Sequence, residues 1–427
     1  MKKLLAILMV LLFATGAFAE DAAKFNFSAS GIAYATNYST IFKDQGGDYS
    51  AFRVRPLFTL TNGSLEAVVK LEYDATFGAT AAAGTGNDDV DGAIGKNGEN
   101  VGLGADKKAL EVAQAYAKTK IDGIEGLTIL GGIAGYDFPL IWSDNAPMFN
   151  VTYANDAIAV ALYYVKASEG NNNKSKDDSQ IYIADITAKF GESSIRPVFM
   201  AFQCKEEPEF GQYVDSQGYI PGIAANLAFG AFGVDTAFAY ITGKDKTAAA
   251  EVDYTAYAFD FAPYFKVSEA VKITAFYTLV SGDDDSTDDE ENSFNNATID
   301  GGGAYMNTAR LFIFEDAGSF TTNSEVCGAT AKTSENGYTA YGLAIDASFG
   351  AISAKIQGAY VAATKVASGV KKDMGYEFDA NIGYAVTKGS TLFIEGAYLK
   401  TGKYYEEGGS VDTQDAMYVV GGMTFSL

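Results

Sequence analysis

Apolar and polar residues alternate one by one along much of this chain, and this constrains its fold more than any other feature. In residues 376–386, Tyr, Phe, Ala, Ile, Tyr and Val take every second position, and Glu, Asp, Asn, Gly and Ala lie between them. Residues 65–77 alternate in the same way, and so do 232–240, 341–349 and 352–360. A period of two places the two sets on opposite faces of an extended strand. The sequence therefore predicts an all-β protein.

The composition of the two faces indicates what they contact. Each apolar face holds five to seven residues, roughly the ~25 Å apolar band of an outer-membrane barrel. A soluble antiparallel sandwich also alternates. Here, however, the apolar faces often end in aromatic residues, such as Tyr73 and Phe77 or Tyr376 and Tyr384. Aromatic girdles of this kind flank the lipid-facing band of barrels, so the pattern favours a membrane barrel.

The spacing predicts eighteen strands, with sixteen as an alternative. They are expected at 25–35, 51–61, 64–77, 108–120, 126–136, 148–155, 157–167, 180–190, 193–203, 219–229, 231–242, 251–265, 270–281, 337–349, 351–362, 374–387, 390–401 and 415–427. Tight turns such as Asn62-Gly63 alternate with long polar loops at 78–107, 168–179, 204–218, 282–336 and 402–414. Short periplasmic turns and long extracellular loops are typical of a transmembrane antiparallel β-barrel.

Residues 1–19 have the pattern of a secretory signal peptide. Lys2 and Lys3 precede the apolar run 4–13, and Ala17-Phe18-Ala19 forms a small-x-small cleavage site. The run is too short to cross a bilayer as a helix, which takes about 20 residues. Residues 20–427 are then predicted to form a single barrel domain in a bacterial outer membrane, exported through the periplasm.

The composition argues against several classes of function. The chain has no histidine, the commonest general base and metal ligand, so we expect no enzyme and no required cofactor. Its net charge of −23 would repel phosphate backbones, so we expect no nucleic-acid partner.

Three stretches resemble outer-membrane porins, specifically the homotrimeric porins of sulfate-reducing bacteria and their relatives. They are 112–121, 126–144 and the acidic stretch 281–294. The apolar stripe that ends at Phe425 and Leu427 resembles the C-terminal signal for barrel insertion. The resemblance implies passive diffusion of ions and small hydrophilic solutes through a water-filled lumen. It also implies a trimer in a Gram-negative outer membrane, in contact with lipid and lipopolysaccharide.

In trimeric porins the third long loop narrows the channel, and here that loop is expected at 137–147. It carries Asp137, Asp144 and Trp142, the only tryptophan. Arg53 and Arg55 share the polar face of one strand, so we expect them to oppose these acids and set a transverse field. The alternatives are a surface turn with ordinary wall ion pairs, or a constriction made instead by residues 78–107 or 282–336.

The lumen is expected to be acidic on balance. Its predicted acids include Glu66, Glu72, Asp74, Glu377 and Asp379, together with Asp185, Asp235, Asp346 and Glu395. An acidic lining attracts cations, which predicts a modest cation preference unless Arg53 and Arg55 reverse it at the narrowest point.

Three further features of the sequence are less specific. The acids Asp283, Asp284, Asp285, Asp288 and Asp289 offer oxygen ligands for a weak Ca²⁺ site, or form a solvated loop. Cys204 and Cys327, the only cysteines, are a candidate disulfide or two separate thiols. Small residues at 29, 31, 33, 35, 131 and 135 suggest a subunit interface.

The alternatives to a general porin are a substrate-specific channel and a structural or adhesive barrel without transport. An acid-lined lumen, rather than an aromatic one, favours the general pore.

Overall fold

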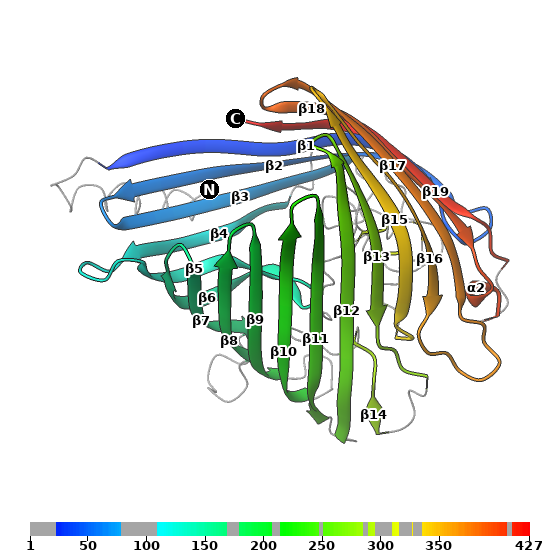
Figure 1. Ribbon diagram of the computed structural model, residues 1–427, viewed down its shortest axis with the longest axis horizontal. Coiled ribbons are helices and arrows are strands. Elements are labelled where there is room, and N and C mark those ends of the chain that lie inside the picture. The colour runs from blue at the N-terminus through cyan, green and yellow to red at the C-terminus, as the bar shows by residue number, and fades with distance from the viewer. Residues whose placement is uncertain are drawn as a thin grey trace.

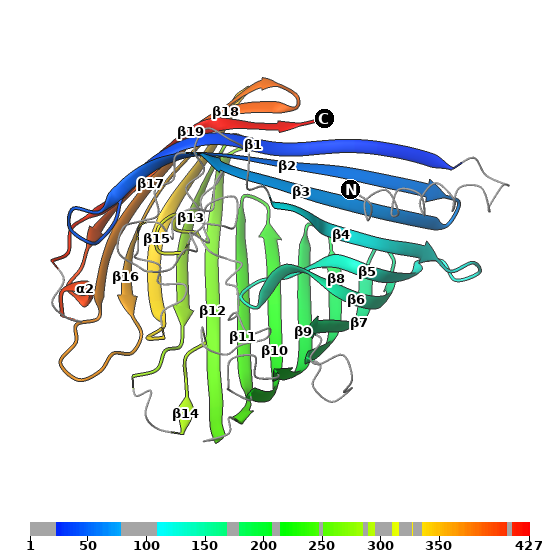
Figure 2. The same cartoon turned by 180° about the vertical axis from the view of Figure 1, so that it is seen from behind.

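Eighteen long strands follow one another around a closed ring, and every pair of neighbouring long strands is antiparallel (Figures 1 and 2). The computed structural model describes residues 23–77, 109–168, 179–206, 214–246, 251–284, 289–294, 310–315, 327, 335–407 and 412–427. The ring closes because β1 pairs with both β2 and β19. The predicted eighteen-strand antiparallel barrel is confirmed, and the alternative of sixteen strands is wrong. The signal-peptide prediction falls outside the described residues.

The strand bounds follow the predicted alternation closely. The strands are β1 (Lys24–Ser39), β2 (Gly46–Asn62), β3 (Leu65–Phe77), β4 (Ala109–Lys120), β5 (Leu127–Phe138), β6 (Trp142–Ala154), β7 (Ile158–Ser168), β8 (Ser179–Phe190), β9 (Ser193–Glu206), β10 (Val214–Phe229), β11 (Phe232–Lys246), β12 (Glu251–Ser268), β13 (Val271–Val280), β14 (Glu290–Glu291), β15 (Tyr338–Phe349), β16 (Ile352–Ala363), β17 (Asp373–Thr387), β18 (Ser390–Thr401) and β19 (Ala416–Ser426). The two-residue β14 pairs in parallel with β12 and lies outside the ring order of long strands. One turn of helix, α2 (Tyr404–Glu407), precedes β19.

Along the strands, exposed apolar side chains alternate with side chains that point into the barrel. On β17, Tyr376 and Phe378 are 49% and 58% exposed on the outer face, whereas Glu377 and Asp379 are buried inside. Membrane barrels face lipid with apolar side chains and keep polar ones in the lumen. Across the described residues, no helix is long and apolar enough to span a membrane.

Aromatic rows mark both edges of the outer apolar band. Near the long-loop rim, Tyr341, Tyr360 and Tyr376 stand side by side on β15, β16 and β17, with ring centroids 5.4 and 4.9 Å apart. Near the short-turn rim, Phe232 and Phe265 pair across β11 and β12 at 4.6 Å. Such girdles lie at the two membrane–water interfaces.

The short turns contain glycines at the positions that the sequence indicated. Gly63 and Gly350 have φ of 56° and 62° in the β2–β3 and β15–β16 turns. Glycine adopts this left-handed backbone without a Cβ penalty, as tight hairpins require.

Candidate pore constriction

The hairpin of β5 and β6 leaves the barrel wall part of the way along its length. Pairing of β5 with β4 ends at Ile133, and pairing of β6 with β7 begins at Met148. Residues 134–147 therefore pair only with each other. The predicted eleven-residue loop at 137–147 is wrong in form, because the register continues from Ala134–Ala146 to Phe138–Trp142. Only residues 139–141 form the turn, with Leu140 at a φ of 69°.

Gly132 lies where this hairpin separates from the wall. Its φ is 135°, and a Cβ there would lie 2.3 Å from the carbonyl oxygen of Ala115. We expect Gly132→Ala to destabilise the protein by about 1–3 kcal/mol. The measurement is the free energy of unfolding by guanidinium in detergent. Gly131→Ala is the control, since a Cβ at Gly131 would find its nearest neighbour, Phe149, only at 3.9 Å. Equal effects of the two substitutions would contradict this role for Gly132.

The tip of the hairpin lies inside the barrel. Phe138, Leu140 and Ile141 are fully buried. A Cβ added to Gly222, on the inner face of β10, would lie 3.1 Å from both Phe138 and Ile141. The tip thus contacts a strand four places beyond β6 around the ring. The hairpin of residues 134–147, hereafter the inner hairpin, folds into the lumen.

An arginine on the wall holds the inner hairpin in place. Arg196 of β9 pairs with Asp185 of β8, with Nε 3.0 Å from Oδ1. Its guanidinium also lies 5.0 Å from the ring centre of Phe138 and 5.7 Å from that of Tyr136. The Tyr136 hydroxyl donates to Asp185 at 3.1 Å. Cation–π contact and charged hydrogen bonds together hold the hairpin against β8 and β9.

A second segment fills the lumen on the other side. Residues 310–315, between β13 and β15, read Arg-Leu-Phe-Ile-Phe-Glu, and Leu311, Phe312, Ile313 and Phe314 are all fully buried. Phe312 lies 6.4 Å from Tyr418 on the inner face of β19. This segment, hereafter the inner segment, belongs to the loop 282–336 that the sequence offered as an alternative constriction.

Carboxylates of the wall bind the backbone of the inner segment. Glu377 accepts from the backbone N–H of Ile313 at 2.5 Å and from that of Phe314 at 2.9 Å. Asp379 accepts from the N–H of Phe312 at 3.3 Å. These N–H groups belong to no strand ladder, so the wall carboxylates satisfy donors that burial would otherwise leave unpaired.

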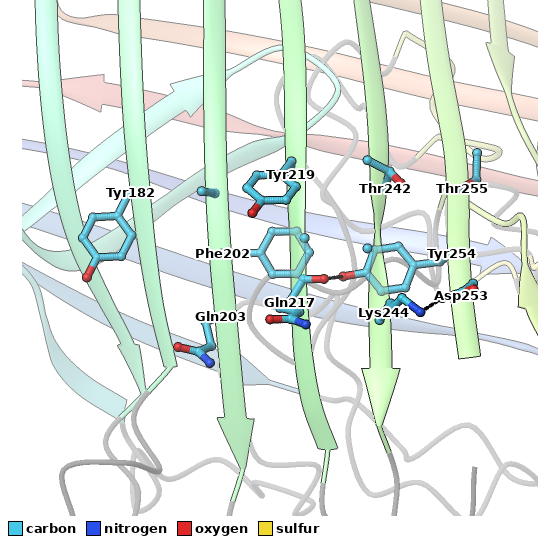
Figure 3. A pocket seen from close by; sticks show the side chains of 13 residues that line it. Tyr182, Phe202, Gln203, Gln217, Tyr219, Thr242, Lys244, Asp253, Tyr254 and Thr255 are labelled. Carbon is cyan, nitrogen blue, oxygen red and sulfur yellow. Dashed lines mark hydrogen bonds and ion pairs between the residues drawn. The ribbon is translucent and has the colours of Figure 1, made fainter. Parts of the chain in front are cut away.

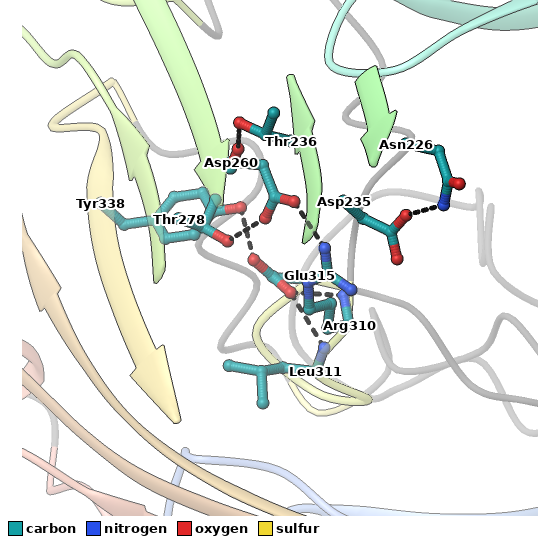
Figure 4. Close-up of polar contacts among 9 residues, drawn as sticks. All are labelled: Asn226, Asp235, Thr236, Asp260, Thr278, Arg310, Leu311, Glu315 and Tyr338. Atoms are coloured by element: carbon teal, nitrogen blue, oxygen red, sulfur yellow. Dashed lines mark hydrogen bonds and ion pairs between the residues drawn. The ribbon is translucent and has the colours of Figure 1, made fainter. Parts of the chain in front are cut away.

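The two ends of the inner segment form a second polar cluster (Figure 4). Glu315 accepts from the N–H of Leu311 at 2.9 Å and from the hydroxyl of Tyr338 at 2.8 Å. Burial raises the pKa of Glu315 above its usual range, despite these donors. Arg310 pairs with Asp260 of β12, which also accepts from Thr278 at 2.9 Å.

Arg53 and Arg55 lie on the lumen face of β2, as expected. Both pair with Glu72 on β3, and the Arg53–Glu72 distance is 3.1 Å. The alternative of wall ion pairs therefore describes these two arginines. Asp137 is exposed and lies on the opposite face of the hairpin from Tyr136 and Phe138. The side chains of Asp74 and Asp144 lie outside the described residues.

The four arginines are more exposed than the acids they pair with, although Asp346 on β15, which pairs with Lys272, has a side chain that is 40% exposed. All four arginines of the chain point inward with partly exposed side chains: Arg53 25%, Arg55 36%, Arg196 27% and Arg310 22%. Their partners are less exposed: Glu72 11%, Asp185 6% and Asp260 2%. Of the acids expected to line the lumen, Glu72, Asp185, Glu377, Asp379 and Glu395 are buried in contacts with the chain itself. Glu66 is half-buried on β3.

Trp142 begins β6 within the inner hairpin and is buried against Tyr136, with ring centres 5.6 Å apart. It packs within the constriction and does not line the open lumen.

Two of the five acids expected to form a weak Ca²⁺ site have partners within the chain. Asp283 accepts from the N–H of Asn292 at 2.7 Å, and Asp284 pairs with Lys365 at 3.3 Å. Asp285 and Asp288 lie outside the described residues, and Asp289 uses its backbone carbonyl to bind Asp253. Within the described part of the chain, no three acidic, cysteine or histidine residues come close enough together to hold a metal ion.

The cysteine disulfide is not formed. Cys327 is a buried thiol, and its carbonyl accepts from the N–H of Ile41 in the β1–β2 connection. Cys204 belongs to β9, eight strands from β1 in a ring of eighteen. The two cysteines thus attach to nearly opposite walls, beyond the ~4.4–6.8 Å Cα separation that a disulfide needs. The side chain of Cys204 lies outside the described residues.

Sequence reasoning missed Arg196, Asp260, Arg310 and the inner segment. Two signals pointed to them. Arginine is rare in this chain, and Arg196 shares its strand face with Val198 and Met200. The run Leu311–Phe314 is also four apolar residues inside a loop otherwise rich in polar ones, which is unusual for a segment exposed to water.

Comparison with known proteins confirms the fold alone. No family model and no curated protein matches the chain. Among solved structures, Acinetobacter baumannii OccAB1 is similar with a TM-score of 0.60 and 10% identity, over 96% of this chain and 99% of that one. Pseudomonas aeruginosa OccK8 (OprE) has a TM-score of 0.57 at 11% identity, over 95% and 98% of the two chains. Pseudomonas aeruginosa OpdO has a TM-score of 0.56 at 14% identity, over 95% and 97%. These matches support the barrel and give no support to the narrower likeness to sulfate-reducing bacteria.

Proposed function

We propose that this chain is a bacterial outer-membrane porin, a water-filled channel for passive diffusion of ions and small hydrophilic solutes. One observation carries the proposal: a closed barrel has an apolar, aromatic-edged outer wall and partly exposed arginines inside. Charged side chains that point inward and still reach solvent require water in the lumen. The inner hairpin and the inner segment narrow that lumen, as a diffusion channel requires to exclude large solutes.

Solute uptake into proteoliposomes tests this function. Vesicles that contain the refolded protein are expected to swell in isosmotic small sugars and amino acids, and not in large dextrans. Absence of swelling with protein shown to be folded by heat-dependent gel mobility would overturn the channel and favour a structural or adhesive barrel.

The selectivity we propose differs from the cation preference expected from the acid count. At the inner hairpin and the inner segment, solutes meet Arg196 and Arg310, which are more exposed than their carboxylate partners. Because selectivity is decided where a pore is narrow, we propose a modest anion preference that added salt weakens by screening.

A homotrimer remains a proposal drawn from the resemblance. Gly31, one of the small residues of β1, has a second explanation, because a Cβ there would lie 2.4 Å from the Phe425 ring. Native mass spectrometry in detergent is expected to give three chains per particle, and a monomer would overturn the trimer.

A further inference from the structure

The outer wall carries a polar row across five neighbouring strands, just beyond the apolar band. Cross-strand register places its members side by side from β8 to β12, and they are Gln180, Gln203, Gln217, Lys244 and Asp253. We call these five residues the glutamine row. The next row toward the membrane centre is Tyr182, Ala201, Tyr219, Thr242 and Thr255.

The exposure of alternate side chains shows that both rows face outward. Tyr182 and Tyr219 are 53% and 56% exposed. Phe202 and Tyr254, which lie between the two rows on β9 and β12, are both 3% exposed and point inward. The row lies at the long-loop rim, since Gln217 is near the start of β10 and Lys244 is near the end of β11.

A hollow of about 750 Å³ is centred on these two rows (Figure 3). Gln203, Gln217, Lys244, Tyr182 and Tyr219 border it. Behind it the Tyr254 hydroxyl covers Gly218 and Gly243, at 2.7 and 2.5 Å from where their Cβ atoms would be. The hollow is of a size that holds a small polar ligand.

The carboxamides in the row are available for a ligand. Across the described residues, no protein group hydrogen-bonds the side chain of Gln203 or Gln217. Gln180 accepts from the Tyr182 hydroxyl at 2.9 Å and keeps its amide donors. Unpaired carboxamides are costly among lipid tails, so the row must lie at the level of the lipid headgroups.

The charges in the row indicate which part of a headgroup is recognised. Lys244 lies 2.9 Å from Glu251 and 3.0 Å from Asp253. This ammonium is already neutralised, so it offers little to a phosphate. Three carboxamides beside two exposed tyrosine rings instead match the hydroxyl groups and apolar faces of sugars.

We propose that the glutamine row binds the sugar units of an outer-leaflet glycolipid. This inference rests on the proposed outer-membrane location. The carboxamides hydrogen-bond sugar hydroxyls, while Tyr182 and Tyr219 support the ring faces from below. The site thereby holds lipid at one sector of the wall, β8 to β12.

The test uses the full-length mature protein in detergent and the triple variant Gln180→Leu, Gln203→Leu, Gln217→Leu. Purified lipopolysaccharide is titrated and its binding followed by native mass spectrometry. We expect the triple variant to bind at least about tenfold more weakly, the change that about 1.4 kcal/mol brings. Phosphatidylglycerol, which has a phosphate and no sugar, is expected to bind both proteins equally.

Thr339→Leu is the matched control. Thr339 precedes Tyr341 on the outer face of β15 by two residues, as Gln217 precedes Tyr219 on β10. This variant should bind lipopolysaccharide like the wild type. Equal binding by the triple variant would overturn the inference, and so would a lower oligomeric state with unchanged lipid binding, which would make the row a subunit contact. Solute uptake is measured on the same samples, so a failure of the channel is distinguished from a failure of this site.

Discussion

Replacement of Glu377 by alanine is expected to raise single-channel conductance severalfold. Its carboxylate accepts from the N–H groups of Ile313 and Phe314 inside the barrel. Without it, two buried donors of the inner segment lose their partners, at about 1–3 kcal/mol each. The packed position of the inner segment then loses about 2–6 kcal/mol relative to a position in water. A change of this size moves most molecules to the arrangement in which the inner segment lies in water and the lumen is wider.

The measurement is conductance in a planar bilayer, with barrel integrity checked by heat-dependent gel mobility. Glu66→Ala is the control, because it removes a lumen-side carboxylate from β3, five strands away from β17. A wider pore in Glu377→Ala alone would support the inner segment as a constriction. Equal conductance of the wild type and Glu377→Ala would contradict that role.

Replacement of Arg196 by methionine is expected to destabilise the protein by about 3–5 kcal/mol, because it leaves Asp185 as an unpaired buried charge. The inner hairpin also loses the guanidinium that contacts Tyr136 and Phe138. Trp142, the only tryptophan, reports on this directly since it packs against Tyr136. Its fluorescence emission is expected to shift to longer wavelength as water reaches the ring.

A double variant separates the charge from the packing. Asp185→Asn combined with Arg196→Met removes both charges, so it should be less destabilised than Arg196→Met alone. Arg53→Met is the control for the substitution type, because Glu72 keeps Arg55 as a partner. If the double variant were as unstable as the single one, the ion pair would not be what holds the hairpin.

The barrel was predictable because its signal is local. Each strand shows its two faces within ten residues, as at 376–386, and each short turn has its own Gly or Asn. Closure of the sheet could also be expected, because an unpaired strand edge is costly in a membrane. The inner hairpin was misjudged because β5 and β6 keep strand pairing after they leave the wall, and alternation does not say which neighbours a strand has.

The lumen was less predictable because its contacts are distant in sequence. Glu377 lies 64 residues from Ile313, and Arg310 lies 50 residues from Asp260. The one-by-one alternation of residue types correctly placed Glu72, Glu377 and Asp379 on the inner face. It gave no means of knowing that Glu377 binds backbone N–H groups or that Glu72 pairs with two arginines. The acid count alone therefore did not reveal that Glu72, Glu377 and Asp379 are buried in contacts with the chain itself.

Single-channel recording of the wild-type protein under a KCl gradient tests the central claim most directly. We expect discrete conductance steps with a reversal potential of the sign expected for Cl⁻, and a weaker selectivity at high salt. A lack of steps from folded protein would contradict the channel itself. Steps that reverse with the sign expected for K⁺ would contradict the view that the arginines, and not the buried acids, meet the solute.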